Sequence, residues 1–134
     1  ASPEAPQPAL DDVDALVHDA ADAGQVVELE VTGDVGRISA PVSRHAYRIV
    51  QEGVTNARKH APGAAVAVVV VVASDVHLTV INAVPESGQR DQSGGGFGLV
   101  GVAERVEQVG GSLEHGVRDG RFVLDAQLPL RGVA

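Results

Sequence analysis

The stretch from Tyr47 to Pro62, Y-R-I-V-Q-E-G-V-T-N-A-R-K-H-A-P, decides the fold. At about 100° per residue, small and branched apolar side chains fall on one face of a helix that begins near Ser39. Such a face must be buried against a sheet or against other helices. The apolar face holds Ala46, Ile49, Val50, Gly53, Val54, Ala57 and Ala61. The opposite face, which we expect to be exposed to solvent, holds Tyr47, Arg48, Gln51, Thr55 and Arg58.

Four polar residues flank the apolar face of this helix. Glu52 is followed by Asn56, Lys59 and His60 at i+4, i+7 and i+8, so all four point the same way. A carboxylate, an amide, an ammonium and an imidazole at the edge of a buried face indicate a site, although lysine and histidine also favour the C-terminal turn of an ordinary surface helix. Lys59 is the only lysine among ten basic residues, which favours the site.

Length, charge and composition narrow the possible functions. The chain has 134 residues, no cysteine and a formal net charge of −8. This length predicts one domain, and the absence of cysteine excludes disulfides and thiolate chemistry. The negative charge argues against a direct nucleic-acid partner. We expect no signal peptide, because the chain starts with an acidic, proline-rich stretch, and its longest apolar run is about half of a membrane span.

The order of periodic segments predicts an α/β sandwich, with a mixed, mostly antiparallel sheet covered on one face by about three helices. One domain should span residues 10–130, between a linker at 1–9 and a tail at 131–134. The unbroken apolar run Ala64–Ala73 predicts a strand buried on both faces. Besides the central helix, the expected helices are Leu10–Ala23 and Val102–Val109, and the other expected strands are Gln25–Thr32, Val76–Val84, Ser112–Gly116 and Arg121–Leu130.

A glycine-rich turn, Gly94–Gly98, opens the last helix and follows the long polar loop Pro85–Gly95. Backbone N–H groups exposed by such a turn can hold a phosphate, although a glycine-rich hinge has the same composition. The turn matches neither the dinucleotide fingerprint nor the Walker motif. This turn would supply hydrogen-bond donors to a phosphate, and the central helix would supply hard oxygen ligands and a cation. Together these groups indicate a site for a magnesium nucleotide.

Two motifs resemble those of the catalytic ATP-binding domain of bacterial two-component sensor histidine kinases, in the GHKL superfamily. Y-R-I-V-Q-E-G-V-T-N-A-R-K-H-A resembles the N-box, and G-G-G-F-G-L-V-G-V-A-E-R-V the G2 region. More narrowly, the chain is similar to the subfamily that phosphorylates NarL-type response regulators, from about Leu10 to Leu130. The resemblance implies a Bergerat-type ATP-binding fold, histidine kinase activity and a cytoplasmic domain of a sensor kinase that can be membrane-bound.

The resemblance also implies roles for individual residues. Asn56 would hold Mg²⁺, and Glu52 would act as the catalytic residue by positioning groups near the γ-phosphate of ATP. Pro85–Gly95 would be the ATP lid. The remaining nucleotide-binding residues would be Lys59 and His60 near the phosphates, Asn82 near the base, and Gly96, Phe97, Gly98 and Leu99 at the loop and helix start beneath the phosphates.

The chain departs from the family in the G1 box. Where the family has D-x-G-x-G, this chain has N-A-V-P-E from Asn82 to Glu86, which puts adenine affinity in question. An amide oxygen accepts a hydrogen bond less strongly than a carboxylate. A nucleotide-weak pseudokinase or docking module is therefore one alternative, and a serine kinase of the anti-sigma type on the same fold is another.

The expected partners follow from what the sequence lacks. No pair of dimerisation helices precedes Leu10, so the phosphoacceptor histidine should belong to a separate dimerisation domain. A NarL-type response regulator would then be an indirect partner. Without dimerisation helices, the isolated fragment should be a monomer.

Overall fold

The computed structural model describes residues 8–84 and 96–131, with residues 96–100 described by their backbone alone. Its three α-helices are α1 (Val13–Asp22), α2 (Ala40–His60) and α3 (Gly96–Gln108). Two short 3₁₀ helices, η1 (Leu10–Asp12) and η2 (Val35–Arg37), precede α1 and α2. The strands are β1 (Val27–Thr32), β2 (Val66–Val72), β3 (Asp75–Ala83), β4 (Ser112–Arg118) and β5 (Arg121–Pro129).

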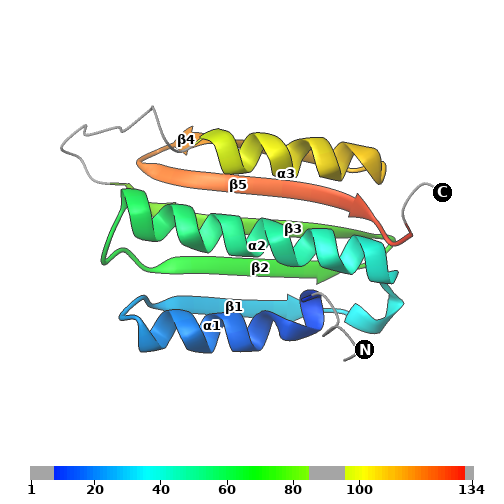
Figure 1. The fold of residues 1–134 in the computed structure, drawn as a ribbon, viewed down its shortest axis with the longest axis horizontal. Helices are drawn as coiled ribbons and strands as arrows, with labels where there is room; N and C mark the ends of the chain where they lie inside the picture. Colours follow the sequence, from blue (N-terminus) through cyan, green and yellow to red (C-terminus); the bar gives the residue numbers. More distant parts are fainter. Residues whose placement is uncertain (1–7, 85–95, 132–134) are drawn as a thin grey trace, which may run out of the picture.

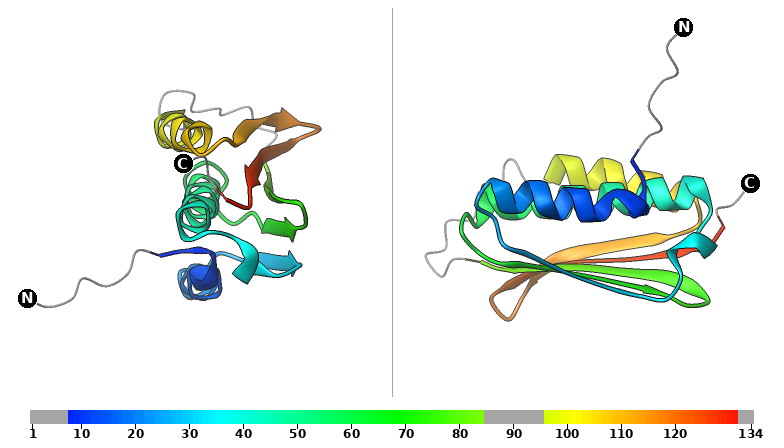
Figure 2. Two further views of the ribbon diagram at one scale, coloured as in Figure 1. Left: turned by 90° about the vertical axis from the view of Figure 1, so that its right-hand side faces the viewer. Right: turned by 90° about the horizontal axis from the view of Figure 1, so that it is seen from below.

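These strands form one sheet in the order β1-β2-β3-β5-β4. Among the described pairings, β1 with β2 is parallel, and the other three are antiparallel. A parallel neighbour requires a crossover connection, and α2 lies in the one between β1 and β2. The helices form a single layer on one face of the sheet (Figure 1, Figure 2). The predicted α/β sandwich with a mixed, mostly antiparallel sheet is therefore confirmed.

The core lies between the sheet and the helix layer, and α2 fills its centre. Ile49 and Val50 have no exposed surface, and Val54 is 1% exposed. Every second residue of β2, β3 and β5 faces α2 and its neighbours, as the pleat of a strand requires. This helix-facing set contains Val66, Val68, Val70, Val72, Val76, Leu78, Val80, Leu124, Ala126 and Leu128.

The opposite face of the sheet corrects one prediction. The run Ala64–Ala73 predicts burial on both faces, but Val71 is 37% exposed and Val69 is half-buried. The described helices all lie on the other face, so nothing in the described part of the chain covers these side chains (Figure 2). On this face, His77 Nε2 lies 2.5 Å from Asp125 Oδ1, a polar contact between β3 and β5.

The limits of the segments also differ from the sequence prediction. The sequence predicts the last helix over Val102–Val109, but α3 begins at Gly96. The low helix propensity of its glycines conceals that start. The predicted lid, Pro85–Gly95, lies outside the described residues, as do residues 1–7 of the linker and 132–134 of the tail. The domain limits therefore stay a prediction.

Candidate functional site

The four polar residues predicted to flank the apolar face lie in the C-terminal half of α2. Glu52, Asn56 and His60 are half-buried, and Lys59 is exposed. Partial burial fits side chains at the edge of the packed face. Among the described residues, neither Glu52 nor Lys59 takes part in an ion pair. A carboxylate and an ammonium group at this edge are therefore available to a ligand.

Asn82 is the one buried polar side chain of β3 in the described structure, with 4% of its surface exposed. It alternates with Val80 and Leu78, so its side chain points towards the helix layer. The carboxamide Nδ2 donates a hydrogen bond to the carbonyl oxygen of Ala83, at 3.0 Å. Among the described residues, Oδ1 accepts no hydrogen bond, so it is the atom of the carboxamide that can accept one from a ligand.

The topology brings Asn82 to the same end of the fold as the polar residues of α2. Asn82 pairs with Val66, the first residue of β2. The chain reaches Val66 shortly after α2 ends at His60. The end of β3, which carries Asn82, and the last turns of α2 therefore lie at one end of the sandwich (Figure 1).

The first turn of α3 completes this end of the molecule. α3 lies beside α2 and runs in the opposite direction (Figure 1). Gly96, Phe97 and Gly98 begin the helix and Leu99 follows them. The first N–H groups of a helix have no intrahelical partner and favour an anion. The first turn of α3 thus presents N–H groups at the same end of the fold as the polar residues of α2.

His60 contributes a buried polar atom, Nε2, without a hydrogen-bond partner in the described structure. Buried polar atoms are almost always partnered, because an unmade hydrogen bond costs about 1–3 kcal/mol. A ligand group at the end of α2 could supply the missing partner. Gln25 Oε1 and Ser39 Oγ are also buried without a partner in the described structure, so this atom is consistent with a site beside Asn56 but does not by itself identify one.

The donor set fits a magnesium ion that arrives with a nucleotide, and does not fit an ion held by protein alone. No group of three or more His, Cys, Asp or Glu side chains in the described residues could hold a metal. Mg²⁺ usually takes one or two protein oxygens and completes its shell with phosphate oxygens and water. The amide oxygen of Asn56 is a suitable single ligand of this kind.

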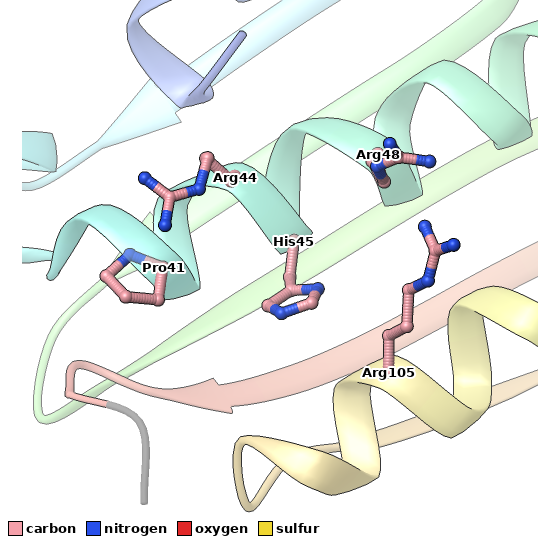
Figure 3. Close-up of a pocket in the computed structure, with 5 residues that line it drawn as sticks. All are labelled: Pro41, Arg44, His45, Arg48 and Arg105. Atoms are coloured by element: carbon pink, nitrogen blue, oxygen red, sulfur yellow. The ribbon is translucent and has the colours of Figure 1, made fainter. Parts of the chain in front are cut away.

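A basic groove that the sequence prediction missed lies between α2 and α3. Its lining residues are Pro41, Arg44, His45, Arg48 and Arg105, and its volume is ≈ 320 Å³. We call it the arginine groove. Arg105 extends from α3 towards α2, and His45 lies between the two helices (Figure 3). The spacing of Arg44, His45 and Arg48 puts them on one side of α2, which was a usable signal, but Arg105 is distant in sequence.

Burial and charge together act on His45. Burial makes the largest contribution to lowering its pKa below 6.5, followed by the positive charges of Arg105, Arg44 and Arg48. Both effects disfavour the imidazolium form. At neutral pH, the groove therefore presents three guanidinium groups and an uncharged imidazole.

No described helix combines the length and apolar character needed to cross a bilayer.

No protein-family model matches the chain. The chain is similar to the sensor histidine kinase YxjM of Bacillus subtilis, with 36% identity over 119 residues, which are 86% of this chain and 29% of YxjM. It is also 29% identical over 109 residues to the sensor histidine kinase LnrJ of the same organism. The chain thus spans 29% and 27% of these relatives.

Solved structures share the fold at lower identity. The catalytic domain of the histidine kinase ThkA has a TM-score of 0.64 at 13% identity, and the match covers 92% of each chain. The histidine kinase domain of a blue-light activated kinase from Erythrobacter litoralis has a TM-score of 0.65 at 20% identity, over 90% of this chain and 63% of that one.

Proposed function

The chain is a homologue of the catalytic region of bacterial sensor histidine kinases, and we propose that it is an ATP-binding kinase domain. It would transfer the γ-phosphoryl group of ATP to a histidine on a separate dimerisation domain. One observation carries this proposal: the polar residues of α2, the buried Asn82 and the first turn of α3 lie at one end of the fold. Phosphoryl transfer depends mainly on positioning and charge neutralisation, which such an arrangement can supply.

Asn82 would select the base in this site. Its Nδ2 is already engaged with Ala83, so Oδ1 is the atom left to accept a hydrogen bond from the adenine amino group. The first N–H groups of α3 would meet the phosphates. Lys59 is exposed at the end of α2 and would add a positive charge beside them.

Asn56 would hold Mg²⁺ through its amide oxygen, together with phosphate oxygens. When bound, the ion supplies neutralisation of the charge that develops on the phosphates. His60, beside it on α2, carries a buried Nε2 that has no partner among the described residues and would bond a phosphate or a water in the filled site.

Glu52 would orient the acceptor. It lies one helical turn before Asn56 on the same side of α2, about 6 Å along the axis. A carboxylate there would accept a hydrogen bond from one imidazole N–H of the incoming histidine and aim the other ring nitrogen at the γ-phosphorus. Without that bond, the imidazole would reach the phosphate in many orientations and react more slowly.

The cellular setting is part of the same proposal. We place the domain in the cytoplasm, in a sensor kinase whose other parts include the dimerisation domain. The phosphoryl group would pass from the histidine to a response regulator, which we take to be of the NarL type from the motif resemblance. The isolated fragment would be a monomer.

Calorimetric titration with a non-hydrolysable ATP analogue, with and without Mg²⁺, tests the binding part. Asn56→Ala should weaken the Mg²⁺-dependent affinity about tenfold or more, since a ligand to the ion is lost. Gln51→Ala, on the exposed side of α2, should bind like the wild type. Unchanged Mg²⁺-dependent binding by Asn56→Ala would refute the metal assignment.

Transfer to the dimerisation domain tests the catalytic part. Glu52→Gln should bind the analogue normally but transfer the phosphoryl group roughly 10²-fold more slowly. A wild-type transfer rate in this variant would show that Glu52 has no such role. A serine-bearing protein offered in place of the histidine-bearing domain distinguishes a serine kinase of the anti-sigma type.

A nucleotide-weak docking module remains the second candidate, because Asn82 stands where the family has a carboxylate. Asn82→Asp separates the two possibilities. If the pocket is functional but weakened, the variant should bind the ATP analogue more tightly. If the module does not use nucleotide, neither the wild type nor this variant should bind at millimolar concentration.

A further inference from the structure

No carboxylate lines the arginine groove in the described structure. The described ion pairs are His18 with Asp22 and His77 with Asp125, so none of the three guanidinium groups of the groove is paired. No other described arginine is paired with a carboxylate either, so what distinguishes the groove is that three guanidinium groups line one hollow. Three like charges in one groove repel one another, and an anion that binds there relieves the repulsion.

The groove is separate from the proposed nucleotide site. It lies beside the N-terminal half of α2, whereas Asn56 lies in the other half (Figure 3). From Arg48 to Asn56 the helix rises about 12 Å, and from Arg44 it rises about 18 Å. An anion bound between Arg44 and Arg105 therefore occupies a place of its own.

The form of the groove favours an elongated ligand. Arg44 and Arg48 stand one helical turn apart on α2, which is about 6 Å along the axis, and Arg105 faces them from α3. Arg44 lies in the second turn of α2 and Arg105 in the last turn of α3, and the charged groups that line the groove are the guanidinium groups of these side chains and of Arg48. Carboxylates at i and i+4 on a partner helix have the same spacing as the two arginines.

We propose that the arginine groove binds an acidic helix of a partner protein, through paired contacts between its carboxylates and Arg44, Arg48 and Arg105. Arginine suits this role because its planar group bonds a carboxylate with two hydrogen bonds. The proposal does not depend on nucleotide binding or on phosphoryl transfer.

Charges on the other side of α2 direct the partner to the α3 side. A second hollow, of ≈ 330 Å³, is lined by Pro8, Arg44, Tyr47, Arg48 and Gln51. Burial raises the pKa of Tyr47, and the negative charges of Asp12 and Asp19 raise it further. These carboxylates would repel an acidic helix from that hollow.

His45 makes the interaction dependent on pH. The charged groups that face it are Arg44 and Arg48 on its own helix and Arg105 on α3, and all of them disfavour its protonation. A bound carboxylate has the opposite effect and raises the pKa of His45. Binding of the acidic helix is therefore coupled to the uptake of a proton by His45. The affinity for the helix should increase as the pH falls through the range between the pKa of His45 in the bound protein and its pKa in the free protein.

The test uses an alanine-rich helical peptide with glutamates at i, i+4 and i+8, titrated calorimetrically at low ionic strength without nucleotide. Its control peptide has the same composition, with glutamates distributed around the helix. The proposal expects the one-faced peptide to bind about tenfold more tightly than its control. Equal binding of the two peptides, or no binding of either, would overturn it. Inorganic pyrophosphate that binds more tightly than the one-faced peptide would also overturn it, in favour of a small-anion site.

Matched variants locate the site. Arg44→Ala, Arg48→Ala and Arg105→Ala combined should weaken peptide binding about 100-fold or more, since three charge-assisted contacts are lost. The control combines Arg37→Ala, Arg118→Ala and Arg121→Ala, three exposed arginines outside the groove with the same total charge. The control should change the affinity about twofold at most. Similar losses in the two triple variants would mean that only net charge matters and would refute the groove.

Two single variants keep the test decisive if the triple variant is poorly folded. Arg105→Gln removes the charge contributed by α3 and should weaken binding about tenfold. His45→Gln should keep the binding at pH 7.5 but lose the increase in affinity between pH 7.5 and 5.5. Wild-type affinity in Arg105→Gln, or an unchanged pH dependence in His45→Gln, would contradict the proposed geometry.

Discussion

Gly53 of α2 lies directly against Val80 of β3: a Cβ atom built on Gly53 would stand 2.8 Å from Cγ1 of Val80. The same atom would lie 3.2 Å from Cδ2 of Leu124 on β5. Carbon atoms pack at about 3.5–4.0 Å, so no side chain fits at this position without displacing the sheet or the helix. This contact sets the depth at which the neighbouring Glu52 and Asn56 stand above the sheet.

Gly53→Ala should destabilise the fold by about 1–3 kcal/mol, because the added methyl group overpacks the interface. The loss should appear even though alanine is favoured over glycine in a helix by about 1 kcal/mol. Urea unfolding measures the change. Gly101→Ala in α3 is the matched control, since a Cβ there meets no described atom outside the backbone of its own helix within 4 Å, and it should be neutral or stabilising. Equal effects of the two substitutions would show that helix propensity, rather than contact with Val80, governs Gly53.

Val70 and Val71 of β2 should respond differently to the same substitution. Val70 has no exposed surface and faces the helices, whereas Val71 is 37% exposed on the other face. Val70→Thr buries a hydroxyl group and should cost about 1–3 kcal/mol of stability. Val71→Thr should change the stability by about 0.5 kcal/mol or less. Chemical denaturation of the two variants checks this, and a large loss for Val71→Thr would indicate that something covers the outer face.

The stability of the protein should depend on pH through His45. Burial, and then the charges of Arg105, Arg44 and Arg48, lower its pKa in the folded state below 6.5. As the pH falls, the unfolded state therefore takes up a proton first, and the folded state loses relative stability. The contribution of His45 to the free energy of unfolding is fully present above pH 6.5. It is lost as the pH falls through the lowered pKa of His45 in the folded state.

His45→Gln isolates this contribution from the many carboxylates that also titrate. Between pH 7.5 and 5.0, the wild type should lose more unfolding free energy than His45→Gln, measured in urea at both pH values. A parallel decline of the two proteins would mean that His45 does not titrate differently in the folded and unfolded states.

Asn82→Ala should weaken binding of the ATP analogue about tenfold, because it removes the buried acceptor proposed for the adenine amino group. Binding of a guanine nucleotide should change less, since guanine lacks that amino group at the same position. Calorimetry with both nucleotides gives the comparison. If the two affinities fall equally, Asn82 supports the fold through its bond to Ala83 and does not read the base.

Local patterns predicted most of the fold, because the apolar periodicity in α2 and β3 coincides with actual burial. In β1 the agreement is partial, since Val27 and Leu29 are half-buried but Val31 is 40% exposed. The one-sided exposure of β2 was not predictable, since the run from Val66 to Val72 has no polar residue to mark the outer face. The start of α3 was concealed for a related reason: glycine carries no side-chain pattern, so Gly96 and Gly98 resemble a turn.

The candidate site was predictable where it follows the period of one helix. Glu52, Asn56, Lys59 and His60 lie on one edge of α2 because their spacing requires it. The arginine groove was not predictable, because it depends on α2 and α3 packing side by side, which brings Arg105 to His45 from a distant part of the chain. The orphaned Nε2 of His60 likewise depends on burial by the fold rather than on its neighbours in sequence.

The continuity of α2 also limits how the gene can change in length. One inserted codon between Arg48 and Asn56 would rotate everything beyond it by about 100° and turn the polar edge away from Asn82 and α3. Homologues should therefore keep this interval free of insertions and deletions. The hairpin between β4 and β5 carries no such restriction: Asp119 and Gly120 are exposed and already adopt positive φ angles. Length differences among homologues should accumulate there.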